Sequence, residues 1–216
     1  MRYSTILFDL DGTLLDTLDD LQSACNAALH AVGCPPRTRE EVRTFVGNGL
    51  GKLMERALPD GRTNPRFDEA LDLLKSYYST HMKVRTAPYP GILDLLQALK
   101  SQGAHLGVVS NKIQPAVTDL CDTFFPGLLD VAIGERTGIR RKPAPDTVLE
   151  ALRQMNMPPE SAIYVGDSDV DLATARAAAL PCISATWGFR TRADLLAAGA
   201  QLFAKTPADI LRLLTL

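Results

Sequence analysis

Asp9-Leu10-Asp11-Gly12-Thr13 follows directly on the short apolar run Ile6-Leu7-Phe8, and this stretch decides the fold. Such a run is typical of a buried strand in a parallel sheet, and Gly12 is a natural point for the chain to turn out of the strand. Side chains two residues apart on a strand point to the same side. We therefore expect the carboxylates of Asp9 and Asp11 to project together from the carboxyl end of the first strand.

Two carboxylates held this close repel each other, and both stay ionised only if a cation or hydrogen-bond donors neutralise them. A bound Mg²⁺ needs few protein oxygens and leaves coordination positions for phosphate and water. One carboxylate can then attack phosphorus while its neighbour moves protons. For this segment alone, an Asp-Gly turn joining two strands of a hairpin remains the alternative.

Further apolar runs of strand length recur at 106–109, 129–133, 162–165 and 182–185, with a weaker run at 201–204. Between them lie apolar residues at helical spacing. This alternation predicts an α/β fold: a doubly wound, Rossmann-like parallel sheet with right-handed crossovers and helices on both faces. In such sheets ligands bind beyond the carboxyl ends of the strands, where Asp9 and Asp11 are expected.

One region breaks the alternation. Residues 16–82 contain no convincing strand pattern, and their apolar residues fall at helical spacing. The sheet pattern resumes near Ala87-Pro88-Tyr89-Pro90-Gly91, where two prolines and a glycine mark a boundary. We expect an α/β core made of residues 1–15 and 83–216, with residues 16–82 forming an inserted all-helical domain.

The composition is that of an ordinary globular protein, with 46% hydrophobic and 22% charged residues among 216. A formal net charge of −2 gives no support for nucleic acid or an anionic membrane surface as a partner. No export signal or membrane span is recognised, so we expect a cytoplasmic protein. The four cysteines make no Cys-x-x-Cys pair, which argues against a structural zinc site or a disulfide framework.

The segment Ser110-Asn111-Lys112 follows the run at 106–109. A hydroxyl and neighbouring backbone N–H groups at a strand end suit a phosphate oxygen, which makes Ser110 and Asn111 candidates for phosphate binding. Such residues also commonly end strands and cap helices, and that structural interpretation stays open.

Lys142 lies in a basic run followed by Pro143 and Pro145. The prolines stiffen the backbone and could fix the lysine ahead of a helix that starts near Asp146. A fixed ammonium there could pair with a carboxylate and with phosphoryl oxygens during transfer. The alternative is a solvated basic surface.

The segment Gly166-Asp167-Ser168-Asp169-Val170-Asp171 follows the run at 162–165. Asp167 could complete the oxygen shell of a metal held by the first-strand aspartates. If a helix begins here, Asp171 lies one turn further on the same side, where it could hold a metal-bound water or orient Lys142. An EF-hand is excluded because its glycine and glutamate positions carry Leu172 and Ala178. An aspartate-rich helix cap is the alternative.

In these four ordered motifs the sequence resembles the haloacid dehalogenase-like hydrolase superfamily, over nearly the whole chain. The resemblance implies that Asp9 is a nucleophile that forms an aspartyl-phosphate, and that Asp11 protonates the leaving group and then activates water. It implies that Ser110 and Lys142 hold the phosphoryl group. Further implied site residues are Thr13 and Asn111 for phosphate, and Asp9, Asp167 and the backbone of Asp11 for Mg²⁺, with Asp171 behind them.

The helical stretch 16–82 resembles the cap domain of this superfamily. Phe45-Val46-Gly47-Asn48-Gly49, the segment 53–58 and Thr186-Trp187-Gly188-Phe189 are most similar to phosphoglycolate phosphatases, although Val170 stands where those enzymes often carry Asn. Gly47 and Asn48 are therefore candidates for a loop that faces the substrate. A plain turn between two helices fits them equally well.

The resemblance implies a Mg²⁺-dependent phosphatase of a small phosphorylated metabolite, with 2-phosphoglycolate as the expected substrate. A phosphomutase of the β-phosphoglucomutase type, a pyrophosphatase and a nucleotidase share the core motifs and remain alternatives. A metal-independent dehalogenase lacks the second aspartate of the first motif, so Asp11 counts against it. A binding module with an idle site has no support, because no catalytic position is missing. Both a monomer and a homodimer are open.

Overall fold

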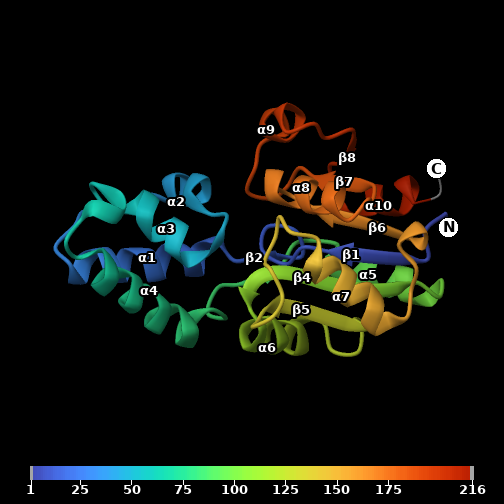
Figure 1. The fold of residues 1–216 in the computed structure, drawn as a ribbon, viewed down its shortest axis with the longest axis horizontal. Helices are drawn as coiled ribbons and strands as arrows, with labels where there is room; N and C mark the ends of the chain where they lie inside the picture. The colour runs from blue at the N-terminus through green and yellow to red at the C-terminus, as the bar shows by residue number, and fades with distance from the viewer. Residues whose placement is uncertain (1, 215–216) are drawn as a thin grey trace. The chain divides into compact units, whose positions relative to one another are not determined.

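The computed structural model describes residues 2–214, and these divide into two compact units. The first is an α/β unit built from the chain up to Leu15 and from Pro88 onward, and the second is a helical unit, Asp16–Ala87. Figure 1 shows the sheet of the first and the helices of the second. The α/β unit thus resumes at Pro88, inside the proline-glycine segment 87–91 and a little beyond the expected residue 83.

The α/β unit contains a six-stranded parallel sheet in the order β5-β4-β1-β6-β7-β8, which confirms the predicted fold class (Figure 1). Strand β1 lies between β4 and β6, and Phe8 at its end pairs with both Val108 and Val165. The residues that follow these three positions therefore meet at one edge of the sheet. The strands are β1 Thr5–Phe8, β4 His105–Ile113, β5 Val131–Glu135, β6 Ala162–Gly166, β7 Cys182–Ala185 and β8 Leu202–Ala204.

Both faces of this sheet are buried. Leu7 and Tyr164 pack on one face in a cluster that includes Val148 of helix α7 (Asp146–Met155) and Ala175 of helix α8 (Asp169–Ala177). The neighbouring Phe8 points the other way and has no exposed surface, so the opposite face is covered too. The helices of this unit are α5 Ile92–Ser101, α6 Gln114–Phe124, α7 Asp146–Met155, α8 Asp169–Ala177, α9 Arg192–Ala197 and α10 Pro207–Leu213, with a short 3₁₀ turn η2 at Pro159–Ser161.

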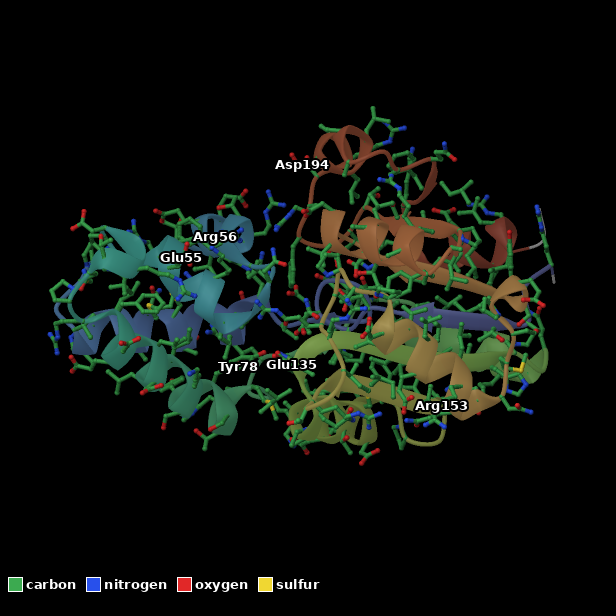
Figure 2. All side chains as sticks on the ribbon, in the orientation of Figure 1. Glu55, Arg56, Tyr78, Glu135, Arg153 and Asp194 are labelled. Atoms are coloured by element: carbon green, nitrogen blue, oxygen red, sulfur yellow. The ribbon has the colours of Figure 1, made fainter. Side chains whose placement is uncertain are left out.

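The helical unit packs its first helix against the other three. Its elements are α1 Leu18–Ala31, α2 Arg39–Phe45, α3 Gly49–Ala57, the 3₁₀ turn η1 Gly61–Thr63 and α4 Phe67–His81. The segment 39–45 lies in the stretch expected to be helical, but its apolar spacing did not mark this helix, which a capping box of Thr38 and Glu41 starts. On α3, the carboxylate of Glu55 accepts hydrogen bonds from Lys52 and Arg62, and Arg56 donates to the backbone carbonyl of Phe45 in α2. Glu55 and Arg56 are labelled in Figure 2.

The two segments that connect the units pair with each other as a short ribbon of β2 Leu15–Asp16 and β3 Ala87–Pro88. Within the helical unit, the buried carboxylate of Asp20 accepts the backbone N–H groups of Arg85 and Thr86, at 3.0 and 2.9 Å. The start of α1 is thereby tied to the end of the insertion. None of the helices within residues 2–214 has the length and apolar character that crossing a membrane requires.

Candidate active site

The turn after β1 brings the first motif against the end of β6. The N–H of Asp9 donates to the carbonyl of Val165 at 2.9 Å, and the chain then turns back so that the N–H of Leu14 reaches the carbonyl of Leu10 at 3.0 Å. Gly12 has φ +86°, and a Cβ there would lie 2.4 Å from Oδ2 of Asp167. Only glycine permits both this left-handed backbone and the close approach of the carboxylate.

Lys142 and Asp9 form a buried ion pair at the centre of the site. The ammonium Nζ of Lys142 lies 2.7 Å from Oδ1 of Asp9, and this oxygen also accepts the N–H of Leu10 at 2.7 Å. Nζ also lies 2.7 Å from Oδ1 of Asp171. One ammonium from the loop before α7 thus joins the first strand to the start of α8.

Asp171 is fully buried and has both carboxylate oxygens in use. Its Oδ1 accepts the hydroxyl of Tyr164 at 3.1 Å in addition to Lys142. Its Oδ2 accepts the N–H and the hydroxyl of Ser168, at 3.1 and 2.5 Å, which completes the capping box of α8. The same side chain therefore starts the helix and fixes the lysine.

Of the two candidates on β4, Asn111 lies beside Lys142. The side-chain amide of Asn111 donates to the carbonyl of Lys142 at 3.0 Å and accepts its N–H at 2.8 Å. Ser110 is buried, and its hydroxyl accepts the N–H of Lys112 at 3.2 Å. The side-chain amide of Asn111 therefore holds the backbone of Lys142 through two hydrogen bonds.

Asp167 is held by groups from two other loops. The hydroxyl of Thr13 donates to its Oδ1 at 3.0 Å, and the N–H of Phe189 donates to its Oδ2 at 2.7 Å. The indole N–H of Trp187 donates to the carbonyl of Thr13 at 3.0 Å. The segment 186–189 thus fixes both the aspartate and the threonine that contacts it.

Negative charge is in excess among the buried groups. Asp9, Asp167 and Asp171 each offer an oxygen within 4.8 Å of the others. Burial, and then the charge of Asp171, raise the pKa of Asp9 well above its usual value and that of Asp167 to about 7. Burial alone would lower the pKa of Lys142, but the carboxylates of Asp171 and Asp9 hold it well above its usual range. One ammonium cannot balance three carboxylates.

The donor set at this cluster suits a hard divalent cation. Asp9 and Asp167 can supply oxygen, which Mg²⁺ prefers, whereas both oxygens of Asp171 are engaged. A double positive charge would offset the two negative charges that Lys142 leaves unbalanced. The side chain of Asp11 is not part of this cluster. Its Oδ1 lies 3.1 Å from Nζ of Lys112, at the end of β4.

Gly47 and Asn48 belong to the helical unit, in the connection between α2 and α3. Gly47, Asn48 and Gly49 all have positive φ, of 120°, 64° and 83°, and α3 starts at Gly49. Asparagine tolerates this left-handed conformation better than most residues with a side chain. That Gly47 and Asn48 face a substrate stays a prediction.

Tyr164 and Lys112 contact the site but were not singled out from the sequence. Tyr164 looked like one more apolar residue of a buried strand, and the only available signal was its polar tip two residues before Gly166-Asp167. Lys112 directly follows Ser110 and Asn111 in the sequence. Its position two residues beyond Ser110 was the signal, because alternate residues of a strand share a side.

The chain is similar to known proteins in sequence and in fold. A family model described as haloacid dehalogenase-like hydrolase matches residues 6–185. A phosphoglycolate phosphatase of Aquifex aeolicus is 35% identical over 186 residues, covering 85% of each chain, and one of Pseudomonas putida is 35% identical over 191 residues, covering 85% of this chain and 70% of that protein. A crystal structure from Lactobacillus delbrueckii subsp. bulgaricus has a TM-score of 0.95 at 36% identity and covers 99% of both chains.

Proposed function

The chain belongs to the haloacid dehalogenase-like hydrolase family, and on this premise we propose that it is a Mg²⁺-dependent phosphatase that hydrolyses 2-phosphoglycolate through an aspartyl-phosphate. One observation carries the proposal. The ammonium of Lys142 lies 2.7 Å from both Asp9 and Asp171, so the carboxylate that we assign as nucleophile is buried, oriented and paired. Preorganised charge of this kind is what phosphoryl transfer requires.

In the first step we assign attack on phosphorus to Oδ2 of Asp9, because Oδ1 is engaged by Lys142 and by the N–H of Leu10. The new bond joins Oδ2 to phosphorus, and the bond from phosphorus to the leaving oxygen breaks. Asp11, which has to enter this step in its protonated form, transfers its proton to that oxygen, which departs as an alcohol. Lys142 and the hydroxyl of Ser110 are the groups we assign to the charge on the phosphoryl oxygens.

In the second step a water molecule attacks the phosphorus of the aspartyl-phosphate. Asp11, now ionised, takes a proton from that water as its oxygen bonds to phosphorus. The bond between phosphorus and Asp9 then breaks, which releases inorganic phosphate and restores the ionised Asp9 and the protonated Asp11 of the starting state.

We assign Mg²⁺ to the oxygens of Asp9 and Asp167 together with the backbone carbonyl of Asp11. When bound, it would neutralise carboxylate and phosphoryl charge that a single lysine cannot balance. Asp167 is prepared for this task because Thr13 and Phe189 hold both of its oxygens in place. Asp171 keeps Lys142 aimed at Asp9.

The choice of 2-phosphoglycolate is supported by the relatives from Aquifex aeolicus and Pseudomonas putida, which carry the name phosphoglycolate phosphatase. We assign the helical unit, Asp16–Ala87, the role of a cap that helps to select the substrate.

The test is a steady-state screen of the purified protein over some tens of phosphorylated metabolites, in Mg²⁺ and in EDTA, with inorganic phosphate as the readout. We expect 2-phosphoglycolate to give the highest kcat/KM, and EDTA to abolish turnover. A different monoester at the top would overturn the substrate and leave the phosphatase. Full activity in EDTA would overturn the metal assignment, and no phosphate release from any compound would overturn the activity itself.

A further inference from the structure

A second ammonium lies at the site, on the residue assigned as acid and base. Nζ of Lys112 is 3.1 Å from Oδ1 of Asp11, and the two side chains are only 10% and 20% exposed. The backbone of Lys112 is fixed as well, because its N–H donates to the hydroxyl of Ser110. The pair therefore sits where β4 reaches the edge of the sheet that carries the chemistry.

The position of this ammonium is unexplained by phosphoryl transfer alone. Lys142 already supplies a positive charge to Asp9 and the phosphoryl group. Lys112 instead engages an oxygen of the carboxylate that has to reach the leaving group. A negatively charged group of the substrate can pair with Lys112 in place of Asp11. Asp11 is then free to contact the leaving oxygen.

We propose that Lys112 binds the carboxylate of a phosphorylated hydroxy acid and so selects this substrate class, an inference that rests on the function proposed above. Asp11 must contact the ester oxygen of the substrate. In 2-phosphoglycolate a single methylene separates that oxygen from the carboxylate. A cation paired with Asp11 is therefore next to the place where the substrate carboxylate has to lie, and an ammonium facing a carboxylate is a charge-assisted pair.

The experiment compares 2-phosphoglycolate with its amide, which has the same shape without the charge, as substrates of the wild-type protein, Lys112→Met and Lys112→Arg. The readout is the ratio of kcat/KM for the acid to kcat/KM for the amide. We expect Lys112→Met to lower this ratio about 10- to 100-fold, the range for losing a hydrogen bond to a charged group. Lys112→Arg keeps the charge and should retain most of the preference.

Lys100→Met is the matched control. Lys100 also forms an ion pair at the sheet, with Asp130 at 2.7 Å, but it lies on α5. We expect this variant to keep both the activity and the ratio of the wild type. Thermal denaturation of each variant checks that it folds.

The outcomes separate this inference from the function on which it rests. A wild-type protein that prefers the acid, with a preference that survives in Lys112→Met, overturns the role of Lys112 and leaves the function standing. An equal fall in kcat/KM for the acid and the amide in Lys112→Met also overturns the role of Lys112, because the lysine then contributes to phosphoryl transfer and not to recognition of the carboxylate. A wild-type protein that does not prefer the acid overturns the proposed substrate and this inference together.

Discussion

The edge of the sheet beyond β1 and the connection between α2 and α3 were both candidate substrate regions, and they are built differently. At the sheet edge, Lys142 and Asp171 are buried, and each bonds to side chains from other elements. At the connection, Gly47 and Asn48 are half-buried and are distinguished by their positive φ. The comparison teaches that the sheet edge fixes its candidate groups through side-chain contacts, whereas the connection in the helical unit is distinguished by its backbone conformation.

Replacement of Asp9, the proposed nucleophile, should have the largest effect on kcat. We expect Asp9→Asn to lower kcat about 10⁴-fold or more, because an amide cannot form the aspartyl-phosphate. Phosphate release under saturating substrate and Mg²⁺ measures it, with circular dichroism as the check on folding. Wild-type turnover in a folded Asp9→Asn protein would refute the assignment of Asp9.

Removal of the central ammonium should affect both rate and stability. We expect Lys142→Met to lower kcat about 10²- to 10⁴-fold and the free energy of unfolding by about 3 kcal/mol, because buried carboxylates lose their partner. Chemical denaturation and steady-state kinetics measure the two effects.

The comparison variant is Lys52→Met in the helical unit, where the lysine pairs with Glu55 at 2.8 Å and is well exposed. It should cost less than about 1 kcal/mol and leave kcat unchanged. Equal effects from the two lysines would contradict the contrast between the two regions.

Because Asp9 and Asp167 are buried carboxylates, both the stability of the metal-free protein and its stabilisation by Mg²⁺ should depend on pH. The pKa values of Asp9 and Asp167 are raised in the fold, the latter to about 7, against about 4 in an unfolded chain. Their contribution to the stability of the metal-free protein is therefore complete below about pH 4 and is lost as the pH rises towards 7. Mg²⁺ binds the ionised carboxylates, so the rise in Tm that it produces should grow over this range.

Scanning calorimetry in Mg²⁺ and in EDTA at several pH values measures this increment. Asp130→Asn is the control. Burial alone would raise the pKa of Asp130, but Lys100 and the N–H of Leu106 lower it, and it belongs to no metal cluster found within residues 2–214. We expect Asp130→Asn to leave the Mg²⁺-induced rise in Tm unchanged. An increment that shrinks with rising pH would contradict the assignment.

The smallest effect is expected in the helical unit. Asn48→Gly keeps the left-handed backbone and removes only the side chain. We expect KM for 2-phosphoglycolate to rise about 3- to 10-fold with kcat unchanged within about twofold, the pattern of lost substrate binding. A fall in kcat as large as that of Lys142→Met would place Asn48 in the chemistry and remove the contrast.

The sheet was predictable because its evidence is local. The run Ile6-Leu7-Phe8 is a buried strand, and the alternation of runs and helical spacings fixes the fold class. Helix α2 falls in the stretch predicted to be helical, but its bounds were not predictable from apolar periodicity, because it buries Val42 and little else. Its capping box at Thr38 and Glu41 was the better signal.

The site was predictable in its motifs and less so in its contacts. The contacts between side chains depend on the tertiary structure. An example is Asn111, whose side-chain amide forms two hydrogen bonds with the backbone of Lys142. Tyr164 shows the same limit, because a strand pattern does not reveal that a buried hydroxyl reaches Asp171. The pairing of Lys112 with Asp11 joins the end of β4 to the turn after β1, two segments that are distant in sequence.

The central claim is that Asp9 carries the phosphoryl group between the two steps, and rapid-quench trapping tests it most directly. The protein is mixed with 2-phosphoglycolate and Mg²⁺, quenched in acid and treated with borohydride, which reduces an acyl phosphate to homoserine. Peptide sequencing by mass spectrometry should find homoserine at position 9 and an unmodified Asp11. Homoserine at another aspartate, or at none while turnover proceeds, would contradict the account.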